Sequence, residues 1–411
     1  MSPACPVHGS EGPGPPLPAA WWPPGVMAAL RRRAPAAWDP DSGACAACVQ
    51  EAIVETAAGG GHDAVLPSRA RLGLDPGATG AGVTIAFVDS GFHPHPELVF
   101  PSNRIAAWAD AALEPVRHGS FHAGELPRWP GWDRREGRQW HGLMCSAVAA
   151  GNGRLAGGLY PGPAPEARVA LVQVLQPDGR VGNAAIARAL GWLLDSAARL
   201  DLRVVSLAVG GDPTRARARD GVRCAVAELT ARGVTVLAAA GNDGRRSLVP
   251  PASAPEAITV GGYVPGGPGL RNAVLWSNSH GRSAGVAKPD LVAPAAWVAA
   301  PTLPGAGKSL EAPALFERRH APGEEGAAVE RELAARKLLT PHHHHVDGTS
   351  VAVSLAAGVA ACLLQARPGL SPGGLKRLLV ETARPIPGPR ARQGAGALDA
   401  RAALERARSG G

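Results

Sequence analysis

The sequence predicts an α/β protein built on a parallel, doubly wound sheet with helices on both faces. Short continuous runs rich in β-branched residues lie at 83–88, 168–175, 203–209 and 234–240. Such runs are typical of parallel strands that are covered on both faces. Segments with helical spacing alternate with them, and this alternation favours right-handed crossovers between neighbouring strands. Active sites in sheets of this kind lie beyond the carboxyl ends of the strands.

Three segments carry the clearest helical patterns. Over 183–200, apolar residues recur at helical spacing, and Asn183 is a suitable N-cap. Residues 220–232 and 350–366 are also predicted to be helical, and the second of these is rich in small apolar residues. Helices of such composition pack closely against their neighbours, so this one is expected to lie in the core.

Two stretches interrupt the alternation, and we interpret both as insertions in a domain that spans 76–411. Residues 100–138 are loop-like and hold several tryptophans and prolines, whereas 301–345 contain a polar helix candidate at 324–339. Residues 1–75 are rich in Pro, Gly and Ala and show little periodicity. That composition predicts a small irregular N-terminal appendage that ends in a linker.

A run of four histidines, His342–His345, ends the second insertion. We expect it to be a solvated loop end. A metal site or a place at the rim of a cleft is the alternative, and the run by itself favours no function.

Composition indicates a globular protein, with 45% hydrophobic and 18% charged residues. The net charge of +8 comes mainly from scattered arginines, so a nucleic-acid partner is not expected, although salt-dependent retention would test one. No secretion signal and no apolar run approaching about 18 residues is recognised, which predicts no membrane span and a cytoplasmic location. Cys145, Cys224 and Cys362 lie singly in apolar segments, as core cysteines do. The oligomeric state stays open.

Four polar residues stand at the ends of predicted core elements. Asp89 follows the first strand, and Asn242 follows the fourth. His141 opens a small-residue helix, and Ser350 precedes the apolar one. Each has a structural explanation: Asp, Asn and Ser are common in turns and caps, and a histidine beside a tryptophan is often a packing residue. Together, however, they supply a nucleophile, a base, a group that orients the base and an amide donor, which acyl transfer requires.

At this point the sequence resembles the subtilase family of serine peptidases. "VTIAFVDSGFHPHPEL" is similar to the family's aspartate motif, "HGLMCSAVAAG" to its histidine motif and "DGTSVAVSLAAGVAACLL" to its serine motif. "VTVLAAAGNDG" is similar to the motif of the oxyanion asparagine, and "VVSLAVGG" to the substrate-binding strand. The motifs occur in the family's order between about Gly77 and about Ala407.

The resemblance implies a role for each matched residue. Ser350 would be the nucleophile, and His141 would be the general base and later the acid for the leaving amine. Asp89 would fix the tautomer of His141, while Asn242 and the backbone N–H of Ser350 would bind the oxyanion. The expected activity is that of a serine endopeptidase that needs no cofactor for catalysis.

The resemblance also implies a cleft for an extended peptide or an unfolded protein segment. Its two edges would be Ala208, Val209 and Gly210 on one side and Ala239, Ala240 and Gly241 on the other. Small and apolar walls favour an apolar side chain before the scissile bond. A catalytically silent, peptide-binding subtilase fold is the alternative, and it would be favoured if the insertions at 100–138 and 301–345 filled the cleft.

The sequence departs from the family's motifs at several positions. Met144 stands for the second histidine of its motif, and Ala208 for a usual serine. After Ser350, within the serine motif, Val353, Ser354 and Leu355 replace a small residue, a proline and the residue after it. None of these changes removes a residue of the implied catalytic set, so activity remains the expectation.

The N-terminal appendage does not resemble the family's inhibitory propeptide. It carries two close pairs of soft ligands, Cys5 with His8 and Cys45 with Cys48. Four such side chains can form a tetrahedral zinc site that staples a segment lacking a core. Free thiols in a flexible tail are the alternative.

Overall fold

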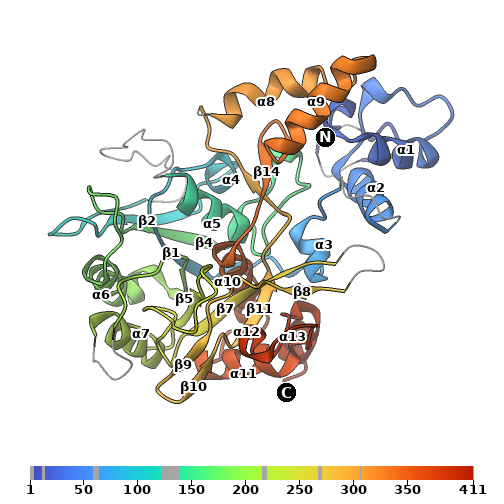
Figure 1. Cartoon of the computed structure of the whole chain (residues 1–411). Helices are drawn as coiled ribbons and strands as arrows, with labels where there is room; N and C mark the ends of the chain where they lie inside the picture. The colour runs from blue at the N-terminus through green and yellow to red at the C-terminus, as the bar shows by residue number, and fades with distance from the viewer. Residues whose placement is uncertain are drawn as a thin grey trace.

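The computed structural model describes residues 4–11, 14–58, 64–121, 139–214, 220–266, 271–305 and 307–410. Within them, nine strands form a central sheet (Figure 1). In spatial order the strands are β11 (Leu291–Pro294), β7 (Ile258–Val264), β6 (Thr235–Ala239), β5 (Leu202–Leu207), β1 (Thr84–Asp89), β4 (Arg168–Gln173), β2 (Ile105–Asp110) and β3 (Arg117–Ser120), with β8 (Ala273–Val274) beside β7. The β2–β3 and β7–β8 pairs are antiparallel, and the other pairs of this sheet are parallel.

Helices cover both faces of the sheet, which confirms the predicted fold class. One face packs against α5 (Trp140–Ala150), α10 (Thr349–Ala366), α11 (Pro372–Thr382) and α13 (Ala400–Arg408), and the other against α6 (Asn183–Leu200) and α7 (Gly221–Ala231). In β1, Ile85 and Phe87 join the first apolar cluster, whereas Ala86 and Val88 join the second. Successive side chains of a strand point to opposite faces, so a strand covered twice must be apolar throughout.

The helix predicted over 183–200 forms as α6, but Asn183 is not its N-cap. The N-cap is Gly182, and no side chain caps the helix. The side chain of Asn183 binds Asp212 instead: Nδ2 donates to the Asp212 carbonyl at 3.1 Å, and Oδ1 accepts from the Asp212 N–H at 3.0 Å. Tertiary contact thus takes the side chain that local propensity assigns to the cap.

The N-terminal appendage is small, as predicted, but it is more regular than its composition suggests. It contains α1 (Pro24–Arg33) and α2 (Ala46–Ala58), with single 3₁₀ turns at Ala19–Trp21 and Pro40–Ser42. Trp22, Leu30 and Ile53 are each at most 2% exposed and form an apolar cluster of its own. The cluster extends to Leu159 and Tyr160 of the sheet domain, so the appendage packs against that domain.

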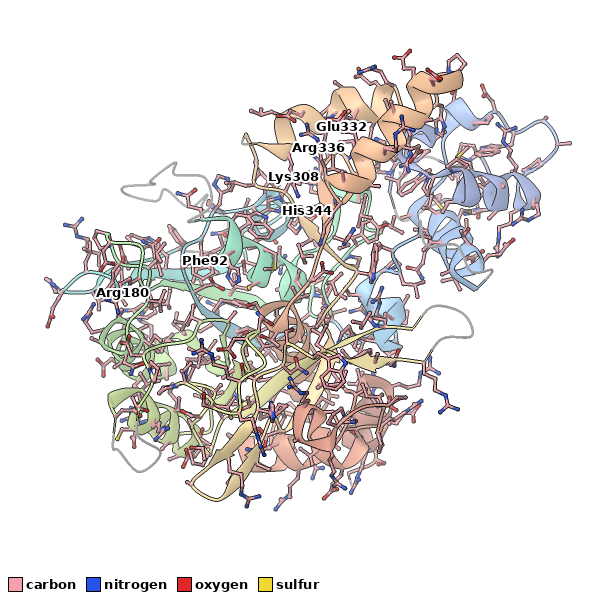
Figure 2. The ribbon with its side chains drawn as sticks, viewed as in Figure 1. Phe92, Arg180, Lys308, Glu332, Arg336 and His344 are labelled. Atoms are coloured by element: carbon pink, nitrogen blue, oxygen red, sulfur yellow. The ribbon has the colours of Figure 1, made fainter. Side chains whose placement is uncertain are left out.

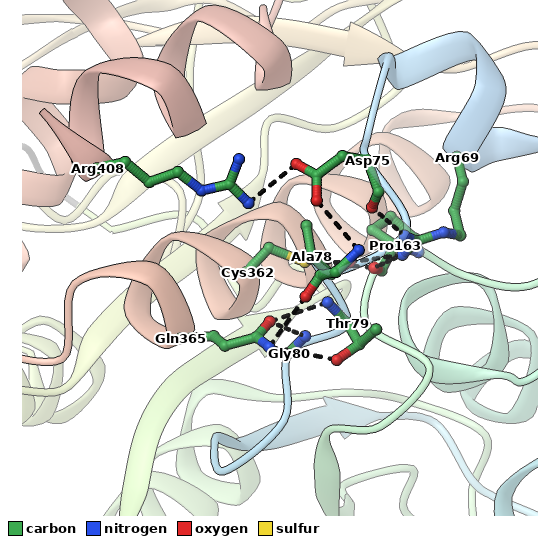
Figure 3. A network of polar contacts seen from close by, with 10 residues as sticks. Arg69, Asp75, Ala78, Thr79, Gly80, Pro163, Cys362, Gln365 and Arg408 are labelled. Atoms are coloured by element: carbon green, nitrogen blue, oxygen red, sulfur yellow. Dashed lines mark hydrogen bonds and ion pairs between the residues drawn. The ribbon is translucent and has the colours of Figure 1, made fainter.

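The segment that joins the appendage to β1 is held against the end of α10 (Figure 3). It contains the short helix α3 (Ser68–Leu72). The guanidinium of Arg69 donates to the carbonyls of Asp75 at 2.7 Å and Pro163 at 2.6 Å. Gln365 of α10 accepts from the N–H groups of Thr79 and Gly80, each at 2.8 Å. The connection is therefore a bonded part of the fold, although the domain boundary near residue 75 stays a prediction.

The loop-like expectation for 100–138 is wrong in the part that the structure describes. Following the short helix α4 (Pro96–Val99), β2 and β3 fall inside this stretch and extend the central sheet. Strand β2 reads IAAWAD, so its alanines gave a weaker strand signal than a β-branched run would give. Residues 122–138 lie outside the described residues.

The stretch 301–345 carries two helices and most of a second sheet. Helix α8 (Lys308–Glu317) is followed by α9 (Gly323–Ala335), which matches the predicted polar helix apart from its last four residues. The three-stranded sheet has the order β12 (Val298–Pro301), β14 (His343–Val346) and β13 (Leu338–Thr340). Smaller elements elsewhere are the 3₁₀ turn Arg154–Ala156, the hairpin β9 (Gly281–Ser283) and β10 (Val286–Lys288), and α12 (Arg390–Gln393).

The expectation that His342–His345 form a solvated loop end is wrong. His343, His344 and His345 belong to β14, the central strand of the small sheet, and are between 1% and 9% exposed. Nζ of Lys308 lies 3.1 Å from Nδ1 of His344, where α8 meets β14 (Figure 2). A run of polar residues favours a solvated loop, whereas here both neighbouring strands and the start of α8 enclose it.

Helix α10 contradicts the expectation that no apolar run in the chain approaches about 18 residues. It is the one helix among the described residues that is long and apolar enough to cross a membrane, with a mean hydropathy of 1.7 over 18 residues. Of that window, 83% is buried inside the protein. The length and composition therefore reflect the role of a core helix that is enclosed on all sides.

The buried histidines predict a loss of stability in mild acid. Burial, with Lys308 close by, lowers the pKa of His344 to about 3, and burial lowers the pKa of His95 to about 4. A histidine in the unfolded chain has a pKa of about 6.5, so below that pH the unfolded chain binds more protons than the folded protein does. The stability that depends on these two neutral histidines is therefore fully present above about pH 6.5, and it is lost as the pH falls below that value.

We expect His344→Gln to lose less stability than the parent between pH 7.5 and pH 5, by about 2 kcal/mol. Urea unfolding at the two pH values measures this difference. His118→Gln, on the exposed strand β3, is the matched control and should follow the parent. An equal loss in the parent and His344→Gln would contradict the assignment.

Candidate active site

Asp89 and His141 meet at the carboxyl edge of the sheet. Asp89 is the last residue of β1, and His141 is the second residue of α5. Nδ1 of His141 lies 2.6 Å from Oδ1 of Asp89, and the two side chains are 34% and 1% exposed. The same oxygen accepts the Ser90 N–H at 2.6 Å. Because Nδ1–H donates to the carboxylate, Nε2 is left as the acceptor nitrogen.

Gly142 allows α5 to come this close to β1. A Cβ at this position would lie 2.2 Å from the carbonyl oxygen of Gly91 and 2.8 Å from the ring of Phe92. Phe92 is labelled beside α5 in Figure 2. The glycine that follows His141 is therefore a requirement of close packing between the helix and the turn after Asp89.

Ser350 opens the buried helix α10. Gly348 is the N-cap with φ at 131°, and no side chain caps the helix, so neither Thr349 nor Ser350 acts as the cap. The hydroxyl of Ser350 donates to the carbonyl of Ala208 at 3.5 Å. Within the described residues, the Ser350 hydroxyl makes this hydrogen bond and makes none to His141.

Cys145 connects the two halves of the site, although its place in an apolar segment predicts only a core residue. Its sulfur lies 3.9 Å from Nδ1 of His141 and 4.0 Å from the carbonyl oxygen of Ser350. One buried atom thus contacts both the imidazole and the residue that carries the hydroxyl. Its position four residues after His141, on the same helix face, was the available signal.

Asn242 lies beside the start of α10. Its Oδ1 accepts the N–H of Thr349 at 2.9 Å, which leaves Nδ2 as a donor. A Cβ on Gly348 would lie 3.5 Å from that Nδ2. The N–H of Ser350, in the first turn of α10, has no intrahelical acceptor. Two donors therefore lie at the positive end of a helix, where negative charge is favoured.

Two segments leave the sheet side by side, 208–210 after β5 and 239–241 at the end of β6. Ala208 is buried, Val209 is half-buried and Gly210 is exposed. Within the described residues, the backbone groups of Val209 and Gly210 carry no hydrogen bond. This segment can therefore pair with an extended chain.

The second segment is already bonded. The N–H of Ala240 donates to the Val260 carbonyl at 2.9 Å, and the N–H of Gly241 donates to Oγ1 of Thr349 at 3.2 Å. These amides hold the segment to β7 and to α10. The two predicted edges therefore differ. The backbone groups of Val209 and Gly210 are open to a partner, whereas the N–H groups of Ala240 and Gly241 are already hydrogen-bonded within the protein.

The electrostatics stabilise the imidazolium that forms when Nε2 of His141 takes a proton. The pKa of His141 is raised, because the sulfur of Cys145 and the carboxylate of Asp89 favour the imidazolium more than burial opposes it. Burial raises the pKa of Cys145 to about 11, so its thiol is neutral near pH 7. The carboxylate is then the group that stabilises the charge on His141.

Asp89, His141 and Cys145 also form a cluster of metal-ligand side chains. The 2.6 Å contact between His141 and Asp89 is a direct hydrogen bond. Two ligands that share a tetrahedral zinc at about 2.0 Å each are about 3.3 Å apart, so this pair is too close to hold an ion between its contacting atoms.

Comparison with known proteins fixes the family. A family model described as "Subtilase family" matches residues 80–396. The chain belongs to the subtilase family. Serine protease AprX of Bacillus subtilis (strain 168) is 28% identical over 311 residues, which cover 73% of this chain and 61% of that protein. Subtilisin BL of Lederbergia lenta is 32% identical over 186 residues, covering 45% of this chain and 57% of that protein. The match spans less than two thirds of either relative.

Solved structures show the same fold. Sphericase has a TM-score of 0.58 at 22% identity and covers 80% of this chain and 96% of its own. Fervidolysin from Fervidobacterium pennivorans, a keratinolytic enzyme related to subtilisin, has a TM-score of 0.56 at 21% identity and covers 80% and 43%. The family match begins at residue 80, so the appendage of this subtilase lies outside it.

The close approach at Gly142 predicts that Gly142→Ala lowers the free energy of unfolding by about 1–3 kcal/mol, because α5 must move away from β1. Urea denaturation measures the change. Gly191→Ala is the matched control, since a Cβ there meets no atom within 4 Å in the helix α6. That variant should be unchanged or up to about 1 kcal/mol more stable. Equal stability of the two variants would contradict the packing argument.

Proposed function

We propose that this subtilase is a serine endopeptidase that uses Asp89, His141 and Ser350 as its catalytic triad. The observation that carries the proposal is the 2.6 Å contact between Nδ1 of His141 and the buried carboxylate of Asp89, next to the N-terminus of α10. The serine protease relatives support the same general activity.

Each proposed step uses a group of this chain. The hydroxyl of Ser350 attacks the carbonyl carbon of the scissile peptide bond while Nε2 of His141 takes its proton. Asn242 Nδ2 and the N–H of Ser350 receive the negative oxygen of the tetrahedral intermediate. When the C–N bond breaks, His141 returns the proton to the leaving amine. Water then hydrolyses the acyl ester by the same route and releases Ser350.

The substrate class follows from the open strand edge. An extended peptide would add to Val209 and Gly210 through its own N–H and C=O groups. The small side chains at 208–210 and 239–241 leave room for an apolar residue before the scissile bond. Hydrogen bonds to the backbone recognise an extended conformation more than a particular sequence. The proposed substrates are therefore peptides and unfolded segments of proteins.

A second candidate is a catalytically silent module that binds peptides. The observation in its favour is that the Ser350 hydroxyl donates to Ala208 and not to His141. If this protein is a peptidase, the Ser350 hydroxyl turns from Ala208 to Nε2 of His141 when substrate binds. Catalytic hydrogen bonds in free enzymes are often long and shorten only in the complex.

Labelling with a fluorophosphonate separates the two candidates. The parent is expected to be labelled and Ser350→Ala to remain unlabelled, because only an activated serine reacts with the probe. Ser409→Ala, at an exposed position after α13, should be labelled like the parent. A folded parent that takes up no label, with folding checked by circular dichroism, would exclude the peptidase and leave the binding module.

The oxyanion role predicts that Asn242→Ala lowers kcat by about 10²–10³-fold with a much smaller change in KM. A peptide substrate that the parent cleaves provides the measurement. Asn242→Asp keeps an oxygen for the Thr349 N–H but removes the amide donor, so it should lose as much activity. Full kcat in Asn242→Asp would rule out the amide as the donor.

A further inference from the structure

Four metal-ligand side chains converge in the N-terminal appendage, outside the region that the family model matches. Cys5 and His8 precede α1, whereas Cys45 and Cys48 lie at the start of α2. One ligand atom from each residue lies within 4.8 Å of the others. Folding therefore brings together two pairs that are far apart in the sequence.

The distances fit a shared ion and not a disulfide. The sulfurs of Cys5 and Cys48 are 3.9 Å apart, whereas a disulfide bond is about 2.05 Å long. The sulfur of Cys45 lies 3.4 Å from Nε2 of His8. A tetrahedral zinc ion with bonds of about 2.3 Å to sulfur and about 2.0 Å to nitrogen separates its ligands by about 3.8 Å and 3.5 Å, respectively.

The burial of the three sulfurs favours a bound cation over free thiolates. Cys5 and Cys45 are 1% exposed and Cys48 is 8% exposed, so three thiolates without a cation would be costly here. The backbone N–H of Cys45 donates to the sulfur of Cys5 at 3.3 Å. The positive end of helix α2 lies at Cys45 and Cys48, and such an end favours negative charge.

His8 is oriented as a ligand from the opposite side. Its Nε2 faces Cys45, while its Nδ1 lies 2.6 Å from the hydroxyl of Ser10. The Ser10 N–H also donates to Nδ1 at 3.2 Å. When Nε2 binds a metal, Nδ1 carries the proton of the neutral ring, so the Ser10 hydroxyl becomes its acceptor and the contact with the Ser10 N–H is released. Cys5 and His8 lie in one turn, in which the N–H of Gly9 donates a hydrogen bond to the Cys5 carbonyl at 2.8 Å.

We propose that Cys5, His8, Cys45 and Cys48 bind one zinc ion in a tetrahedral site with three sulfur ligands and one nitrogen ligand. The three thiols release their protons to solvent when the ion binds, and no other bond forms or breaks. The site is structural, because all four positions are filled by protein and none is left for water or substrate.

The zinc would hold together an element that supports the second insertion. The guanidinium of Arg319, after α8, donates to the carbonyl of Trp21 at 2.5 Å, and it pairs with Glu330 of α9 at 2.7 Å. The ring of His342 packs edge-on against Trp21. A small core such as that of the appendage gains much of its stability from a bound metal. Loss of the ion is therefore expected to loosen the appendage first and then its contacts with the insertion.

Metal analysis of the full chain tests the site. The parent, purified without a metal-affinity step, should carry roughly one zinc per chain, and Cys45→Ser should carry less than roughly a tenth of that. Cys224→Ser, at an exposed position in α7, is the matched control and should keep the parent's zinc. Equal zinc content in Cys45→Ser and the parent would overturn the proposal.

Cobalt binding provides a measurement that needs no variant and no activity. The parent, stripped with a chelator under reducing conditions, should take up one equivalent of Co²⁺ with the strong visible bands of a tetrahedral site and a thiolate charge-transfer band. Zinc should displace it. The stripped protein should also be cut within residues 1–75 by trypsin at least ten times faster than the zinc-loaded protein. Weak octahedral cobalt bands, or a disulfide between Cys5 and Cys48 in the purified parent, would overturn the proposal.

Discussion

The packing of α10 is the constraint on which the candidate site depends. Every residue from Val351 to Leu364 is buried, and the helix contacts β1, β5, β6, β7, β11, α5 and α13. Small residues make this possible: a Cβ on Gly358 would lie 2.9 Å from the carbonyl oxygen of Ala149. A close-packed helix cannot shift without moving its neighbours. The position of Ser350 is therefore set relative to α5, the helix that carries His141.

A buried contact between a histidine and a carboxylate holds the strand that leads into this helix. Nε2 of His343 lies 3.1 Å from Oε1 of Glu97, and both side chains are 1% exposed. Burial raises the pKa of Glu97, but His343 and His95 outweigh it, so the pKa is lowered and the carboxylate is charged. Removing His343 would leave the Glu97 carboxylate charged and buried without this partner, which is strongly destabilising. The pair thus joins β14, in the second insertion, to α4, in the segment that follows Asp89.

The sequence predicted the parts of the fold in which one local signal dominates. Strands β1, β4, β5 and β6 are continuous apolar runs because both of their faces are buried. It failed where tertiary contacts decide, as at β2, whose alanines have weak strand propensity, and at β14, whose histidines are buried by neighbours far along the chain. The same limit applies to Cys145, since its contact with Ser350 depends on how α5 and α10 pack.

The residues around Ser350 hold its backbone and leave its side chain free to turn. Ser354, where the family motif has proline, donates to the Ser350 carbonyl at 2.8 Å, and Cys145 contacts the same oxygen. A hydroxyl that bonds the carbonyl four residues earlier keeps the first turn of the helix closed. The side-chain oxygen, in contrast, has a single bond within the described part of the chain, at 3.5 Å to Ala208, which is at the long limit for a hydrogen bond. Because that bond is weak, little energy opposes a rotation toward His141, and the contact with Ala208 is compatible with a catalytic serine.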